Sequence, residues 1–247
     1  WEDVFAENSD APQLVNVLGV QGDNPWLADQ ILSGDGWRAN DPAGFVEPST
    51  VFEELAGTTY FGVDVVVDDS LRTQLVNAIQ NPGVDATEWL TDYLRDTSIP
   101  NVISSLREME SIAEDYGLGL VSYEGGQHVH HSFAVDGLTQ QQTQILTEFF
   151  TDYVRGPEMA ALYQQLWDGW TEVSDGAFMQ FVDVSPASQW GSWGLLDSLD
   201  DTNPRADYIF DQMQNASNWW GADPNAAYLQ GVTETGTSGD DIMVGTD

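Results

Sequence analysis

The sequence predicts an α/β protein in which four parallel strands alternate with helices. Short apolar runs bounded by glycine, typical of buried strands, alternate along the chain with longer segments of helical spacing. Such alternation implies parallel strands joined by helical crossovers. Four strands at this spacing fit half of a (β/α)₈ barrel of the TIM-barrel type better than an open doubly wound sheet. No Gly-rich phosphate-binding fingerprint follows any of the strands, which disfavours a nucleotide site.

The first strand and its helix lie near the beginning of the chain. The strand is the apolar run Leu14–Leu18, and residues 1–10 read as the end of a helix with its exit loop. Asn24 and Pro25 predict the start of a helix, because proline suits the first helical position, and Gly34 predicts its end. We expect residues 37–57 to form a polar loop.

Helix-capping side chains organise the middle of the chain after a second strand at Thr58–Val63. Asp68 can cap one helix, and Asp85 with Glu88 has capping-box spacing for the next. A third helix runs from about Asn101 to Tyr116. Its predicted inward residues are Val102, Ile103, Leu106, Met109, Ile112 and Ala113.

The second half of the chain repeats the pattern. Leu118–Glu124 and Gly176–Asp183 are the third and fourth strands. Thr139 with Gln142 forms a capping box for the helix between them, and Pro157 restarts helix. The apolar stripe of that second helix reads as core rather than as a binding surface; it comprises Leu162, Leu166, Trp167 and Trp170. A last helix covers residues 206–215.

Charge is the dominant bulk property. The 247 residues include 41 Asp and Glu against 6 basic residues, all of them Arg, for a net charge of −35. This anionic surface disfavours nucleic acids and membrane surfaces as partners, and it suits salty water or Ca²⁺ binding. The chain has no cysteine and no apolar run long enough to span a bilayer. No signal peptide opens the chain, which begins within a pattern, so we expect a fragment.

Glu124 is the foremost candidate for chemistry. It ends an apolar strand at a Gly-rich loop, where packing gives no reason for a carboxylate, and the carboxyl ends of parallel strands are where ligands bind. The competing interpretation is a solvated side chain, or one paired with an arginine.

Three histidines, His128, His130 and His131, follow Glu124 closely and are the only ones in the chain. Imidazole and carboxylate together suit Zn²⁺, although a His-x-His-His loop lacks helical ligand spacing. A sugar contact by His128 and plain loop polarity are the alternatives.

The tail resembles the repeats-in-toxin proteins. Residues 236–247 fit the nonapeptide G-G-x-G-x-D-x-U-x, with Thr237 in place of the second glycine, Asp241 as the metal ligand and Met243 as the inward residue. The resemblance implies Ca²⁺ binding, type I secretion and an extracellular location. We therefore divide the chain into a domain at 1–220 and a linker with the first repeat at 221–247; an ordinary Gly/Asp-rich linker is the alternative.

The chain from Leu14 to Tyr208 resembles the second half of a (β/α)₈ retaining glycoside hydrolase of the large clan that includes secreted bacterial cellulase-like proteins. The segments that carry the resemblance are Val17–Gln21 with Asn24–Trp26, Tyr60–Gly62, Tyr123–His128 and Gln189–Gly194. The four strands would then be the fifth to the eighth of the barrel, and Glu124, which ends the seventh, would be the nucleophile.

The resemblance also implies roles for the surrounding side chains. Tyr60 or Tyr123 would hydrogen-bond the nucleophile and keep it ionised, and Trp190 or Trp193 would form the platform under the sugar. The side chains implied to contact the polysaccharide or oligosaccharide substrate are Gln21, Trp26, Gln127 and His128. No cofactor is implied for catalysis.

One departure from the family pattern limits this interpretation. The family's acid/base is the Glu of an Asn-Glu pair at the end of the fourth strand, and this sequence contains no Asn-Glu pair. We therefore expect an upstream half-barrel, or another copy of the chain, to cover the open strand edges and to supply the proton donor. The alternative functions are a non-catalytic glycan-binding or adhesin module of a secreted calcium-binding protein, and a structural domain in which Glu124 is solvated.

Overall fold

The computed structural model describes residues 15–22, 24–130 and 138–215. The strands in this part of the chain are β1 (Val17–Gly19), β2 (Glu54–Phe61), β3 (Gly119–Gln127) and β4 (Phe178–Gln180). The α-helices are α2 (Pro25–Ser33), α3 (Asp35–Asn40), α4 (Asp64–Val67), α5 (Asp69–Gln80), α6 (Ala86–Tyr93), α7 (Ile99–Asp115), α8 (Gln140–Tyr153), α9 (Pro157–Val173) and α10 (Pro204–Asn215). The helix end predicted at residues 1–10 and the repeat predicted at residues 236–247 lie outside the described residues.

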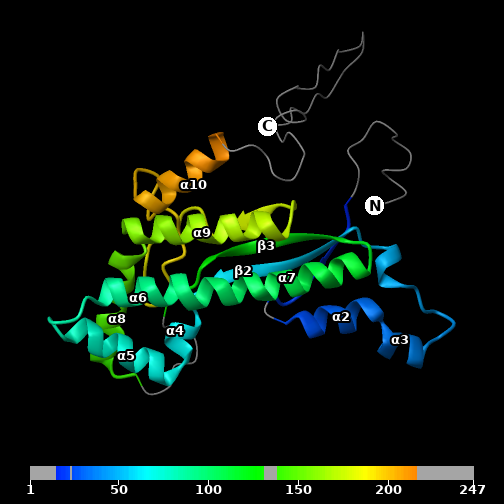
Figure 1. Cartoon of the computed structure of the whole chain (residues 1–247), viewed down its shortest axis with the longest axis horizontal. Helices are drawn as coiled ribbons and strands as arrows, with labels where there is room; N and C mark the ends of the chain where they lie inside the picture. Colours follow the sequence, from blue (N-terminus) through cyan, green and yellow to red (C-terminus); the bar gives the residue numbers. More distant parts are fainter. Residues whose placement is uncertain (1–14, 23, 131–137, 216–247) are drawn as a thin grey trace, which may run out of the picture.

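The strands form one parallel sheet whose spatial order, β1-β2-β3-β4, is also their order along the chain. Right-handed crossovers place successive helices on the same face of such a sheet. Helix α7 contacts β2 and β3, α9 contacts β3 and α7, and α2 and α10 continue this row of helices on either side (Figure 1). The predicted α/β class with parallel strands is confirmed.

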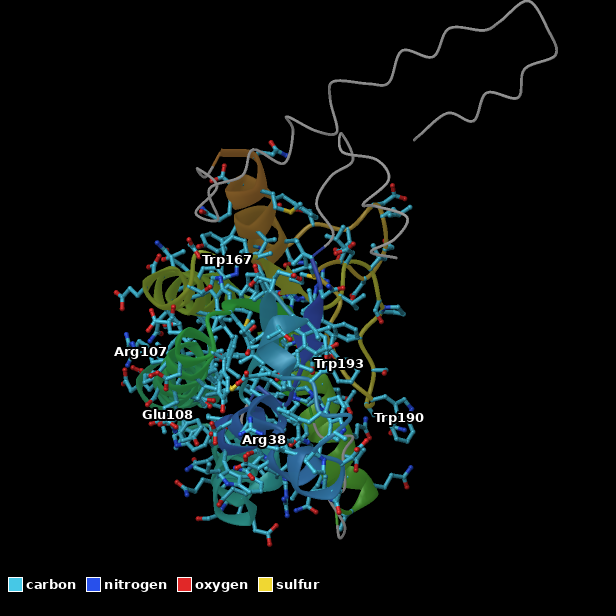
Figure 2. The ribbon with its side chains drawn as sticks, turned by 90° about the vertical axis from the view of Figure 1, so that its right-hand side faces the viewer. Arg38, Arg107, Glu108, Trp167, Trp190 and Trp193 are labelled. Carbon is cyan, nitrogen blue, oxygen red and sulfur yellow. The ribbon has the colours of Figure 1, made fainter. Side chains whose placement is uncertain are left out.

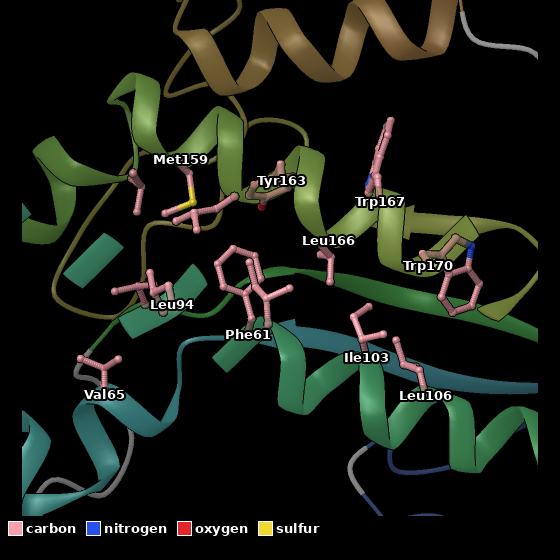
Figure 3. Packing of buried hydrophobic residues seen from close by; sticks show 14 of the residues in the cluster. Phe61, Val65, Leu94, Ile103, Leu106, Met159, Tyr163, Leu166, Trp167 and Trp170 are labelled. Atoms are coloured by element: carbon pink, nitrogen blue, oxygen red, sulfur yellow. The ribbon is translucent and has the colours of Figure 1, made fainter. Parts of the chain in front are cut away.

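The core lies between the sheet and this row of helices. Phe61 of β2 meets the ring of Tyr163 of α9 edge-on, with 5.9 Å between centroids. Figure 3 shows Leu166 of α9 and Ile103 of α7 in the same layer. Complete burial of one side chain of this size contributes about 1.5–3 kcal/mol. The stripe predicted as core is confirmed, since its four side chains are all buried: Leu162, Leu166, Trp167 and Trp170.

The predicted capping residues are confirmed where the structure describes them. The Asp68 carboxylate accepts hydrogen bonds from two backbone N–H groups of α5, and Asp85 accepts one from Glu88 at the start of α6. The Thr139–Gln142 capping box begins α8. Gly34 ends α2 with a φ of 59°, a left-handed conformation that glycine adopts without strain.

The predicted loop at residues 37–57 is wrong in two places. Helix α3 is stabilised by local contacts that hydrophobic periodicity does not register: Trp37 and Arg38 both pack on the ring of Phe45. Strand β2 begins at Glu54, before the predicted Thr58, because its polar and small residues hide it from an apolar pattern.

Helices α6 and α7 are continuous through a π-helical turn at Leu94–Ser98. Pro100 follows this turn and has no N–H to donate to the carbonyl four residues earlier, so the helix widens ahead of it. The turn buries Ser98 beside the end of β2, where its hydroxyl accepts a hydrogen bond from the Gly62 N–H.

The face of the sheet opposite α7 and α9 is hereafter the open face. The pairing register of the four strands assigns to it Val17, Tyr60, Glu124 and Met179. Val17 is 48% exposed and Met179 53% exposed. In Figure 2, Trp190 and Trp193 lie on the side of the sheet away from Arg107 and Glu108 of α7. Within the described residues, no helix is long and apolar enough to cross a membrane.

Candidate functional site

A β-bulge directs Glu124 to the open face. Ser122 pairs with Gly57 of β2, but Glu124, two residues later, pairs with Thr58, so that Tyr123 is an extra residue in β3. Without this shift, Glu124 would point into the core like Leu120 and Ser122, because side chains alternate along a strand. The carboxylate is half-buried. It does not end the strand as predicted, because Gly125, Gly126 and Gln127 continue the pairing of β3 with β2.

Tyr60 is the immediate partner of Glu124. Thr58, which pairs with Glu124, is two residues before Tyr60, so both side chains belong to the open face. Glu124 is the charged group that acts most strongly on the Tyr60 hydroxyl. Burial, followed by the negative charge of Glu124, raises the pKa of the Tyr60 hydroxyl, which keeps it a donor at neutral pH.

Ring side chains from three segments gather beside this pair. His128 stacks at a tilt on Tyr60, with 4.8 Å between centroids, and lies 5.7 Å from the ring of Trp193. His130 and Phe181 also contact Trp193, at 4.9 Å and 6.1 Å. We call these five residues the aromatic cluster. With Glu124 it forms one carboxylate beside a partly exposed ring surface, which suits the apolar face of a sugar.

His128 is a neutral imidazole in this setting. Burial lowers its pKa from 6.5 to about 4. At neutral pH the side chain therefore adds no positive charge to the aromatic cluster, and it can donate or accept a hydrogen bond through its ring nitrogens.

Two glycines after Glu124 allow the strands to approach closely. A Cβ atom at Gly125 would lie 1.7 Å from Oγ1 of Thr59, and one at Gly126 would lie 2.4 Å from the hydroxyl of Tyr163. Gly126 also has a φ of 117°, which other residues rarely adopt. Packing thus requires the Gly-Gly pair that follows the carboxylate.

The other predicted site residues differ in their exposure to solvent and in their contacts. Tyr123, 42% exposed, is the bulge residue, and its hydroxyl acts electrostatically on Tyr60. Gln127 is buried, and both ends of its amide bond the backbone. Outside the aromatic cluster are Gln21, whose amide oxygen accepts from Asn24, and the exposed side chains of Trp26 and Trp190.

A second polar group lies at the end of β2. Both oxygens of Asp64 accept hydrogen bonds, one from the Tyr93 hydroxyl at 2.5 Å and one from the Ser98 hydroxyl at 3.1 Å. Burial, together with this bond, raises the pKa of the Tyr93 hydroxyl. Because every contact joins one element to another, we assign this group to the scaffold that fixes the end of β2.

The metal site considered for the histidines gains no support in the described part of the chain. No group of three or more His, Asp or Glu side chains there is arranged to hold a metal ion. His131 and Asp241 both lie outside the described residues.

Comparison of the chain with known protein families, with curated proteins and with solved structures finds no match.

Sequence reasoning missed several residues that build the site. Phe181 directly follows β4 and could have been found by the rule that pointed to Glu124, that ligands bind at carboxyl strand ends. Asn203 and Arg205 hold the loop that carries Trp193, and no local pattern marks them, because their partners are about ten residues away in a loop.

Proposed function

We propose that the chain carries the nucleophile of a retaining glycoside hydrolase, and that this nucleophile is Glu124. The observation that carries the proposal is the electrostatic coupling of the Tyr60 hydroxyl to a carboxylate that a bulge directs to the open face, with the Tyr60 ring joined through His128 to the half-buried ring of Trp193. The residues that make up this arrangement are those to which the sequence resemblance gave catalytic and sugar-binding roles.

The proposed reaction uses this geometry. The sugar ring lies on Trp193, and a Glu124 oxygen attacks the anomeric carbon, forming a glycosyl ester as the bond to the leaving oxygen breaks. A carboxylic acid protonates that oxygen; then, as its conjugate base, it takes a proton from the water that cleaves the ester. Tyr60 orients Glu124 in both steps.

The finer architecture is part of this proposal. A parallel sheet in sequential order, with its helices on one face, supports the second half of a (β/α)₈ barrel. Val17 of β1, Tyr123 of β3 and Met179 of β4 have exposed side chains. A second set of parallel strands could bury these side chains, so their exposure supports such a set as the partner. This partner would contribute the acid/base carboxyl group.

The rival function is a glycan-binding module without turnover, favoured by the large exposure of Trp190, 64%. Secretion and a calcium-binding tail stay predictions from the sequence.

Glu124→Gln separates the two functions. It keeps the shape of the side chain and removes the nucleophile, so hydrolysis of an aryl glycoside by the chain with its complementary half should fall at least about 1,000-fold. Glycan binding should change little. Glu54→Gln is the matched control, because Glu54 starts β2 at the opposite end of the sheet. Equal turnover in both variants would exclude Glu124 as the nucleophile.

A further inference from the structure

The loop after β4, residues 182–196, presents Trp193 from a buried base. Three backbone carbonyls flank this tryptophan, and each accepts a hydrogen bond from a buried side chain of another segment. The carbonyls are those of Ser192, Gly194 and Leu195. The donors, which we call the loop clamp, are Gln127, Arg205 and Asn203 in the same order.

Gln127 connects the end of β3 to the loop. Its Nε2 donates to the Ser192 carbonyl at 2.6 Å, and its Oε1 accepts from the Val129 N–H at 2.8 Å. The side chain is 1% exposed, so both bonds are shielded from water. This use of the amide assigns Gln127 to the support of the loop.

Asn203 serves two elements at once. Its Nδ2 donates to the Leu195 carbonyl at 2.7 Å, while its Oδ1 accepts from the Ala206 N–H at 3.0 Å and so caps α10. The two functions use different atoms of one amide. A substitution can therefore remove the first and keep the second.

Arg205 holds the middle of the three carbonyls. Its Nη2 donates to the Gly194 carbonyl, and its guanidinium lies 5.7 Å from the ring centroid of Tyr163. The Tyr163 hydroxyl accepts the backbone N–H of Gln127 at 2.9 Å. Two members of the clamp thus meet on one tyrosine of α9.

We infer that Gln127, Asn203 and Arg205 are positioning residues that fix Trp193 as a rigid platform for the apolar face of a pyranose ring. The inference rests on the proposed function for the identity of the ligand. Backbone held by buried hydrogen bonds loses no further freedom on binding, and an aromatic ring held in place saves the ordering cost of a mobile loop. His128 and His130 contact the Trp193 ring from the end of β3.

The test replaces amide donors by isosteric acceptors. Gln127→Glu keeps an oxygen for the Val129 N–H, Asn203→Asp keeps the cap of α10, and each loses its bond to the loop when the carboxyl group is ionised. Asn81→Asp, at an exposed turn where Oδ1 accepts from Gly83, is the control for added charge. All proteins carry 5-fluorotryptophan, and Trp193→Phe identifies the ¹⁹F resonance of Trp193.

We expect one narrow Trp193 resonance in the parent chain and in Asn81→Asp, and a shifted, broadened or split one in both clamp variants. The resonances of the buried Trp167 and Trp170 should stay in place, showing an intact core. An unchanged Trp193 resonance in both variants would overturn the inference. If either variant fails to fold, Asn203→Ser, which retains a capping oxygen, decides by the same criterion.

A second measurement follows the ligand. With the complementary half present, the clamp variants should raise the KM for an aryl glycoside on the order of tenfold and change kcat less. A fall in kcat with an unchanged KM in the clamp variants would contradict a role in sugar positioning. A parent enzyme without turnover would overturn the proposed function alone, because the ¹⁹F result does not depend on catalysis.

Discussion

At the residue scale, the contact between Tyr60 and Glu124 has the largest consequence for function. A phenol that donates to a carboxylate stabilises its charged form and fixes its orientation. It keeps its proton under ordinary conditions, because burial and the neighbouring charge raise the pKa of Tyr60. Its contribution is therefore that of a donor alone.

Tyr60→Phe tests this contribution. The variant keeps the ring that packs against His128 and Phe181 and removes only the hydroxyl. A hydrogen bond to a charged group is worth about 1.5–3 kcal/mol, so the rate of glycosyl-ester formation should fall roughly 10- to 100-fold. Tyr123→Phe, on the exposed bulge residue, is the matched control. A larger effect at Tyr123 would identify it, rather than Tyr60, as the partner of Glu124.

His128 provides a pH-dependent prediction. Its pKa is lowered from 6.5 to about 4 in the folded chain, so between these values the unfolded chain binds a proton that the native one does not. The free energy of unfolding therefore falls as the pH drops through this range. His128→Asn should reduce that fall by at most about 3 kcal/mol in urea unfolding. An imidazole NMR titration with a midpoint near 6.5 would contradict the burial of this ring.

At the element scale, the bulge in β3 decides which side chain reaches the open face. Strict alternation from Leu120 predicts that Glu124 points into the core, and the sequence contains no local signal that Tyr123 is an extra residue. The glycines after Glu124 are visible in the sequence, but the reason for them, contact with Thr59 and Tyr163, is tertiary. The position of the carboxylate in the last part of β3 was predictable, although the strand continues to Gln127, and its orientation was not.

Gly125→Ala tests the packing of the bulge. Its Cβ would overlap Oγ1 of Thr59, so the strands must separate, at a cost of about 1–3 kcal/mol in the free energy of unfolding. Gly36→Ala is the control, because nothing lies within 4 Å of a Cβ there and α3 should be stabilised slightly. Chemical denaturation measures both. Similar stability of the two variants would contradict the described approach of β2 and β3.

Helices were more predictable than strands. Capping residues such as Thr139 and Asp68 act within a few residues of themselves, so the sequence alone locates those helix starts. Strand β2 depends on its partners β1 and β3, and the Phe45 ring that packs on α3 lies beyond the end of that helix. Hydrophobic patterns do not contain that information.

At the scale of the whole molecule, electrostatic repulsion opposes folding. The chain has 41 acidic residues and only 6 arginines, so its net charge is −35. Four of the arginines form ion pairs with carboxylates; they are Arg72, Arg95, Arg107 and Arg155. Screening by salt should therefore stabilise the fold more than the loss of surface ion pairs weakens it.

Thermal unfolding at increasing NaCl tests this balance. Between about 0.01 M and 0.5 M, where the Debye length falls from about 30 Å to about 4 Å, the midpoint should rise by about 2–8 °C. KCl should act like NaCl at equal ionic strength. A midpoint that falls with salt would show that attractive pairs outweigh the general repulsion.

Activated fluoro-sugars detect the covalent bond that we propose between Glu124 and a sugar. The chain, alone and with its complementary half, is incubated with a panel of these probes and digested for mass spectrometry. We expect a glycosylated peptide that contains Glu124, and no such peptide from Glu124→Gln. A label on another carboxylate, or no label under either condition while glycans still bind, would contradict the account and favour the binding module.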